Sequence, residues 1–134
     1  MGFISAIPLF GFILLGYNGL VMSGFFPAQL NTPMLIISLP SGVEWQPDAS
    51  TVMLILAILI LYIELFKSTR TSDVTVVEHM LSTFVLIAFV VEFFIWAPAA
   101  NSAFLLLTLM ALIDVVAGFT ITISAARRDL AMMH

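Results

Sequence analysis

Three polar residues that could do chemistry, Asn18, Glu92 and Asp114, lie inside long apolar stretches of the chain. Asp114 is the one charged residue of the 24-residue stretch 103–126 and lies near its midpoint. About 20 apolar residues cross a bilayer core of roughly 30 Å, and an Asp at its centre costs from about 2.5 kcal/mol upward. We therefore expect Asp114 to face another helix, with Glu92 and Asn18 near enough in depth to complete a candidate ion or proton site.

Asp114 has no counter-ion in the sequence at its own depth, because no Lys, Arg or His lies within the apolar interior of a stretch. It must then be protonated, bind a cation, or meet a basic residue of another chain. Protonation is the simplest of these, since burial disfavours the charged form of a carboxyl group. A purely structural role, with Asp114 satisfied by a neighbouring hydroxyl group or by water, stays open beside the proton or cation site.

Several kinds of chemistry are not expected from this composition. The chain has no cysteine, which removes thiolate metal sites and thiol catalysis. The lack of an interior His or Lys argues against haem ligation by imidazole and against a Schiff-base cofactor. No Ser–His arrangement supports acyl chemistry, and no basic tract supports nucleic-acid binding. We therefore expect a non-enzymatic protein without a metal or a cofactor.

The elements that must position these residues are membrane-spanning helices. Of the 134 residues 62% are hydrophobic and 9% are charged, with a mean hydropathy of +1.19, whereas soluble domains have about 25% charged residues. The N-terminal stretch lacks the basic region of a secretory signal, so we expect it to stay as a helix. The prediction is a single all-α integral membrane domain over residues 1–134, an antiparallel bundle with spans at 3–26, 50–66, 74–96 and 103–126. Their expected N-caps are Asp48 or Ser50, Ser72 or Asp73, and Asn101 or Ser102.

Small residues recur at helical spacing in the first and last spans. On the last span they share a face with Asp114, which points Asp114 into a helix interface. Small side chains let membrane helices approach closely. The residues expected at helix–helix contacts are Gly16, Gly19 and Ser23 in the first span and Ala111, Gly118 and Thr122 in the last.

The positive charges predict the orientation of the chain. Lys67 and Arg70 follow the second span, and Arg127 and Arg128 follow the fourth. With four spans these regions share one side, which the positive-inside rule makes cytoplasmic. Both termini are then cytoplasmic, segment 27–49 is exoplasmic, and the membrane is a plasma membrane, such as a bacterial inner membrane. Glu64, three residues before Lys67, reads as an ordinary pair on a helix surface.

Segment 27–49 is the unusual connection, because four prolines rule out a long helix within it. Residues 34–39 are apolar but too few to span, and Trp45 suits a membrane interface. They could form a short strand or an interfacial piece folded over the bundle mouth. The segment is either a loop resting on the membrane or a docking surface or lid, and we expect residues 34–39 to be ordered and packed against membrane or protein.

The leading functional expectation is a small membrane protein that acts through helix–helix association. It would form a homo-oligomer or an accessory subunit of a larger membrane complex, with membrane lipids as its other partners. The alternative is a proton- or cation-conducting oligomer that uses Asp114 with Glu92, and a weaker one is lipid or quinone binding. Length and span number are similar to those of small multidrug resistance transporters. Their membrane glutamate lies in the first span, where this chain has Asn18 and no acid, so we infer no membership.

Overall fold

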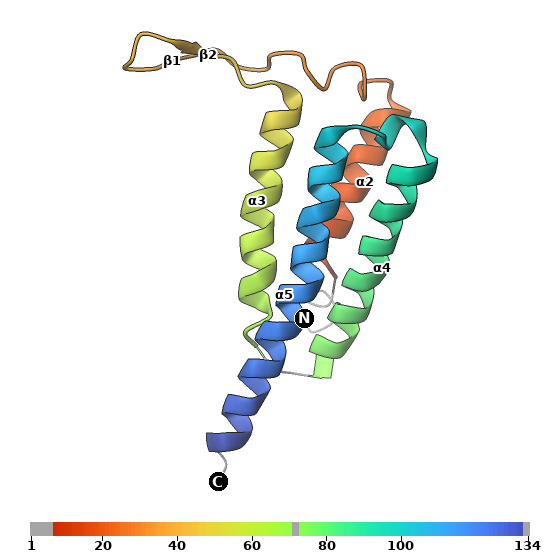
Figure 1. Cartoon of the computed structure of the whole chain (residues 1–134), viewed down its shortest axis with the longest axis vertical. Coiled ribbons are helices and arrows are strands. Elements are labelled where there is room, and N and C mark those ends of the chain that lie inside the picture. The colour runs from red at the N-terminus through yellow and green to blue at the C-terminus, as the bar shows by residue number, and fades with distance from the viewer. Residues whose placement is uncertain (1–6, 71–72, 133–134) are drawn as a thin grey trace.

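The computed structural model describes residues 7–70 and 73–132, which form four α-helices, a small hairpin and one turn of 3₁₀ helix (Figure 1). The helices are α2 (Leu9–Met22), α3 (Ala49–Lys67), α4 (Asp73–Ile95) and α5 (Ser102–Met132). The strands β1 (Ile37–Ser38) and β2 (Glu44–Trp45) lie between α2 and α3, and η1 (Ala97–Ala99) links α4 to α5. The helical bundle expected from the sequence is therefore present.

Helix α5 is the centre of the bundle and packs against both α3 and α4, while α2 packs against α3 and α4. Helices α3 and α5 run in one direction, and α2 and α4 run in the other (Figure 1). Aromatic rings fill the core between them: the ring centroid of Phe89 lies 6.4 Å from Phe10 and 5.3 Å from Phe104, and Tyr17 lies 4.9 Å from Phe104. One aromatic core thus joins α2, α4 and α5.

Three of the helices are long and apolar enough to cross a membrane, which supports membrane integration. These are α3, most of α4, and α5. Helix α2 is apolar too but has only 14 residues, about 21 Å at 1.5 Å per residue. The predicted first span, 3–26, is therefore longer than the helix found, and its first four residues lie outside the described part of the chain.

Helix α2 ends early because a glycine closes it. Gly24 has φ +87°, a left-handed conformation that glycine adopts without strain. Its N–H donates to the carbonyl of Val21, and the N–H of Phe25 reaches back to the carbonyl of Leu20. These two bonds define a Schellman motif, a common helix terminator. The apolar residues after it continue as a turn rather than as helix.

Two of the predicted helix caps are present. Asp48 precedes α3 and accepts a hydrogen bond of 2.8 Å from the N–H of Thr51. Asn101 precedes α5, and its side-chain oxygen accepts one of 2.8 Å from the N–H of Phe104. Each bond satisfies an N–H group that the first helical turn leaves free. Of the caps considered for α4, Ser72 and the side chain of Asp73 lie outside the described residues.

The segment between α2 and α3 begins in the core, where Phe26 and Leu30 are buried, and its middle part then leaves the bundle. Strands β1 and β2 pair antiparallel, with Ile37 opposite Trp45 and Ser38 opposite Glu44. Every residue from 31 to 46 is exposed on the isolated chain. The hairpin projects sideways from the end of the bundle at which α3 begins (Figure 1). Residues 34–39 thus include a short strand, one of the two forms expected. Met34 lines a groove with residues of α2 and α3, whereas residues 35–39 are exposed.

Candidate functional site

A group of charged side chains lies at the end of the bundle where α3 stops and α4 begins. Glu64 and Lys67 come from the last turn of α3, and Lys67 Nζ is 3.7 Å from Glu64 Oε1. The same Nζ is 3.9 Å from Oε2 of Glu78, in the second turn of α4. It also donates a hydrogen bond of 3.3 Å to the carbonyl oxygen of Ile7, just before α2. One lysine therefore connects three segments of the chain.

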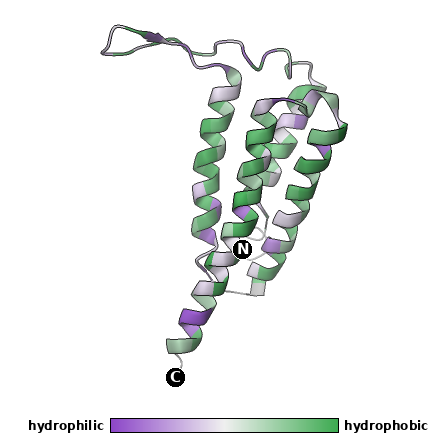
Figure 2. Ribbon diagram, in the orientation of Figure 1, coloured by the Kyte–Doolittle hydropathy of each residue, from purple (hydrophilic) through white to green (hydrophobic). Residues whose placement is uncertain are grey.

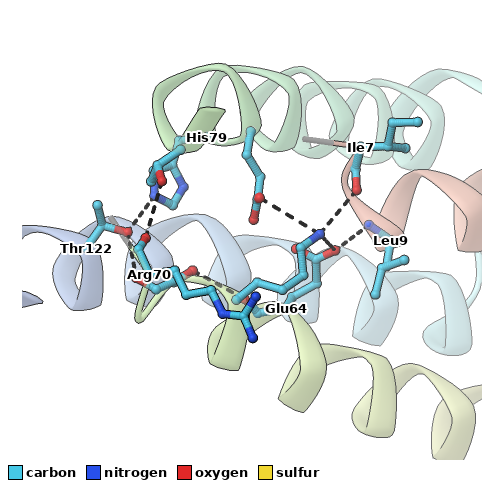
Figure 3. Close-up of polar contacts among 10 residues, drawn as sticks. Ile7, Leu9, Glu64, Arg70, His79 and Thr122 are labelled. Carbon is cyan, nitrogen blue, oxygen red and sulfur yellow. Dashed lines mark hydrogen bonds and ion pairs between the residues drawn. The ribbon is translucent and has the colours of Figure 1, made fainter. Parts of the chain in front are cut away.

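Glu64 is the most deeply buried of these residues, with 1% of its surface exposed. Its Oε1 accepts a hydrogen bond from the N–H of Leu9, the first residue of α2 (Figure 3). That N–H is among those that no helix can satisfy internally. The structure thus differs from the surface pair expected of Glu64 and Lys67. Glu64 points into the bundle and holds the start of α2, and the side chain of Lys67, 22% exposed, folds inward with it.

Asp114 belongs to the same group. It is 5% exposed and interacts electrostatically with Glu64, Glu78 and Lys67. It is the thirteenth residue of α5, and Glu64 is the sixteenth of the co-directional α3, so their depths differ by only about 4.5 Å. No ion pair between Asp114 and a basic residue is found in the described part of the chain, where Lys67 pairs with Glu64 and Glu78. We call Glu64, Glu78, Asp114 and Lys67 the carboxyl cluster: three buried carboxyl groups and one ammonium group, which pairs with Glu64 and Glu78.

A second group of polar contacts beside the cluster connects α5 to α4 and to the end of α3. The Thr122 hydroxyl donates 3.0 Å to the carbonyl oxygen of Ser68, so its lone pair accepts from His79 Nε2, 2.8 Å away (Figure 3). This arrangement places the proton of a neutral His79 on Nε2. Gly118 lies beneath: a Cβ there would be 3.2 Å from Ser68 Oγ and 3.3 Å from His79 Cε1. One turn from Asp114, Ala111 is likewise buried, 2% exposed.

Asn18 and Glu92 meet far from Asp114, in the other half of the bundle. Asn18 Nδ2 donates a hydrogen bond of 3.0 Å to Glu92 Oε2. Asn18 Oδ1 and Glu92 Oε1 are buried and have no hydrogen-bond partner among the described residues. Fourteen residues of α4, about 21 Å, separate Glu92 from Glu78 of the carboxyl cluster. The structure brings together two of the three residues expected at one site and places the third, Asp114, in a different one.

The small residues of α2 face away from the chain. Gly16, Gly19 and Ser23 are exposed, and among the described residues no atom lies within 4 Å of the position that a Cβ would take at either glycine. Gly16 also lines an apolar groove of about 490 Å³ between α2 and α3, beside Tyr17 and Leu56. The small-residue face of α5 is therefore filled within the chain, whereas that of α2 is open.

Sequence reasoning missed Glu64, Glu78 and Lys67 as members of a buried site. The signal was present but ambiguous, because a spacing of three residues between Glu64 and Lys67 suits an exposed helix surface equally well. A clearer sign is that Glu64 and Glu78 flank the same short link and lie opposite Asp114 on an antiparallel bundle. In the described part of the chain, no three or more His, Asp or Glu residues are arranged to hold a metal ion.

Comparisons with known protein families, with curated proteins and with solved structures find no match to this chain. The class of protein is therefore defined by the fold and composition alone. Four helices form a bundle, three of them long and apolar enough to span a membrane, and most large apolar side chains of α3 and α4 point outward. This is the arrangement of a helical membrane protein.

Proposed function

We propose that this protein is a non-enzymatic integral membrane protein that acts by helix–helix association, with further copies of itself or with another membrane subunit. The observation that carries the proposal is the open face of α2. Gly16 and Gly19 lie three residues apart, hence on one side of the helix, with nothing packed on them. Membrane helices associate through such faces, because small side chains allow the backbones to approach closely.

The contrast with α5 strengthens the proposal. On α5 the same kind of residue is covered, since a Cβ on Gly118 would lie 3.2 Å from a neighbouring side chain. A glycine inside a helix costs about 0.5–1 kcal/mol relative to alanine. No packing contact among residues 7–70 and 73–132 offsets these two costs on α2, whereas packing of a partner helix against both glycines would offset them. The groove beside Gly16 provides room for the side chains of that partner.

The test is the mass of the protein, with its co-purifying chains, in mild detergent. We expect an assembly larger than one chain, and we expect Gly16→Leu and Gly19→Leu to shift it to the monomer without lowering the thermal stability of the bundle. Thr120→Leu is the matched control, because it enlarges an exposed side chain on α5 and should leave the assembly intact. A wild-type protein that is monomeric and free of other chains at all concentrations would overturn the proposal.

We also propose an orientation for the chain. It crosses a plasma membrane, such as a bacterial inner membrane, four times, with both termini cytoplasmic and segment 27–49 exoplasmic. Lys67 and Arg70 lie at the end of the bundle toward which α5 also runs (Figure 1). The hydrophilic part of α5 gathers at its projecting C-terminal end (Figure 2), where Arg127 and Arg128 are exposed. Reporters fused at Gly42 and at the C-terminus should report opposite sides of the membrane, and the same side for both would contradict this orientation.

The carboxyl cluster favours a second candidate, a proton- or cation-conducting oligomer. The cluster holds three buried carboxyl groups and one ammonium group, so it needs further positive charge to be neutral. The proton is the better candidate among cations, because no metal-holding group is found in the described residues. Inside one chain, the aromatic core of Phe89 and Phe104 separates this cluster from Glu92, so a continuous path needs the surface between chains. We therefore rank a conducting oligomer below helix–helix association as the candidate function.

Ion-flux measurements on protein in liposomes distinguish the two candidate functions. If protons pass through the cluster, wild-type protein carries a proton flux and Asp114→Asn abolishes it, because an amide cannot release a proton. The assembly should stay unchanged in the variant, which keeps the size of the side chain. If the protein acts by association alone, neither form carries a flux. A wild-type protein without proton or cation flux removes the channel.

A further inference from the structure

The hairpin between α2 and α3 has one apolar face and one polar face. Residues directly opposite in an antiparallel pair point to the same side of the sheet, and successive residues alternate. Ile37 therefore shares a side with Trp45, and Ser38 shares the other side with Glu44. The hydrogen bond from the N–H of Leu39 to the carbonyl of Val43, 2.9 Å long, continues the register. The apolar face is thus made of Ile37, Leu39, Val43 and Trp45.

The turn of the hairpin fixes this register. Gly42 has φ +90°, and its N–H donates 2.9 Å to the carbonyl oxygen of Leu39. A left-handed residue at the end of a three-residue loop is typical of tight hairpins. A one-residue slip would move the apolar side chains to the polar face, so the glycine keeps the two faces distinct.

No residue in the described part of the chain covers the apolar face. The exposed fractions are 39% for Ile37, 39% for Leu39, 60% for Val43 and 42% for Trp45. The hairpin extends across the direction of the helix axes, past α3, at the level of the bundle's end (Figure 1). If α3 crosses a membrane, that level is the membrane surface, where the headgroups meet the acyl chains.

We propose that the hairpin is a membrane-surface anchor, with Ile37, Leu39, Val43 and Trp45 seated in the headgroup region of the lipids that surround the bundle. Three observations indicate that lipid contacts the apolar face. The hairpin lies at the end of the bundle and extends across the helix axes, its apolar and polar side chains are on opposite faces, and the apolar face carries a tryptophan. Tryptophan is enriched at this depth because its ring is apolar and its N–H is polar. Glu44 on the opposite face then stays in water, away from anionic lipid.

The anchor is independent of the proposed association, and a pair of labels can test it. The chain has no cysteine, so Val43→Cys and Ser38→Cys each accept one spin label, on opposite faces of the hairpin and at exposed positions. In phosphatidylcholine vesicles we expect the label at Val43 to be accessible to oxygen, which concentrates in lipid, and protected from a water-soluble nickel chelate. The label at Ser38 should show the reverse, with a several-fold difference between the two accessibility ratios.

Two further variants sharpen the test. Ile37→Asp combined with Leu39→Asp should move the label at Val43 into water, whereas Glu44→Gln on the polar face should not. Two results would overturn the anchor. Equal access of the nickel chelate to both labels would show that the hairpin stands in water. Protection of the Val43 label from oxygen and nickel together, lost on dilution of the protein in lipid, would show that a second copy covers this face.

Discussion

Adding a single methyl group at Gly118 tests whether α5 is as tightly seated as its contacts suggest. The new Cβ would lie 3.2 Å from Ser68 Oγ and 3.3 Å from His79 Cε1, closer than ordinary van der Waals contact. Neither neighbour is free to move: Ser68 Oγ donates to the carbonyl oxygen of Glu64, and His79 bonds Thr122. Gly118→Ala must therefore disturb one of these hydrogen bonds or shift α5.

The size of the effect follows from one stabilising term and two destabilising terms. Alanine gains about 0.5–1 kcal/mol over glycine in a helix interior, and overpacking costs about 1–3 kcal/mol. A lost hydrogen bond between membrane helices adds about 0.6 kcal/mol. We expect Gly118→Ala to lower the free energy of unfolding by about 1–2 kcal/mol, and Gly118→Leu to lower it by more. Gly16→Ala, which meets nothing within 4 Å, should raise it by about 0.5–1 kcal/mol.

The measurement is reversible unfolding in mixed micelles, followed by helicity, at protein concentrations where the chain is monomeric. Leu112→Ala is a second control, because Leu112 is 43% exposed and faces away from the bundle. In a double-mutant cycle, His79→Ala should remove part of the penalty of Gly118→Ala, since the ring is one of the two close neighbours. The reasoning fails if Gly118→Ala and Gly16→Ala shift stability equally and in the same direction.

Three further changes test other contacts. Glu92→Gln places an N–H₂ group opposite the unpaired Asn18 Oδ1, so the same unfolding measurement should show no loss or a gain of about 0.6 kcal/mol; a loss of more than that would mean the charge of Glu92 matters for the fold. Lys67→Met removes the ammonium group that pairs with two buried carboxyl groups, Glu64 and Glu78, and should destabilise the bundle by several kcal/mol, partly restored in acid as protons replace the lost charge; unchanged stability at neutral pH would contradict the cluster. The hydrogen bond from the Thr51 N–H lowers the pKa of Asp48 below its usual value, so its stabilisation is present above that value and is lost as the pH falls below about 4; Asp48→Asn, which keeps a capping side chain, should be less sensitive than wild type over that range when both are melted across a pH series.

The helices could be predicted because their signals are local. Apolar runs of sufficient length define α3, α4 and α5, and the caps Asp48 and Asn101 act on N–H groups three residues away in the sequence. The end of α2 was missed although its signal was also local. Gly24 stops the helix while the apolar composition continues, and composition alone cannot distinguish a helix from an apolar turn.

The partners of the buried polar residues could not be predicted in the same way. Helical spacing places Asp114 on an inward face, but which side chains meet it depends on the relative height of three helices. The pairing of Asn18 with Glu92 was within reach, since both lie near one end of their helices. Lys67 was assigned to the surface because its spacing of three residues from Glu64 suits an exposed helix surface, whereas its long side chain turns inward to Glu64 and Glu78.

Helix α2 contacts the carboxyl cluster at its start and carries the exposed glycine face in its second half. Its first residue, Leu9, donates to Glu64, and Ile7 just before it accepts from Lys67, so the carboxyl cluster holds the start of the helix (Figure 3). Its other half carries Gly16 and Gly19, the open face proposed for association. Helix α2 has 14 residues, about 21 Å at 1.5 Å per residue, so both features lie on one short element. The contacts of Glu64 and Lys67 therefore help to fix the position of the face that we propose for association.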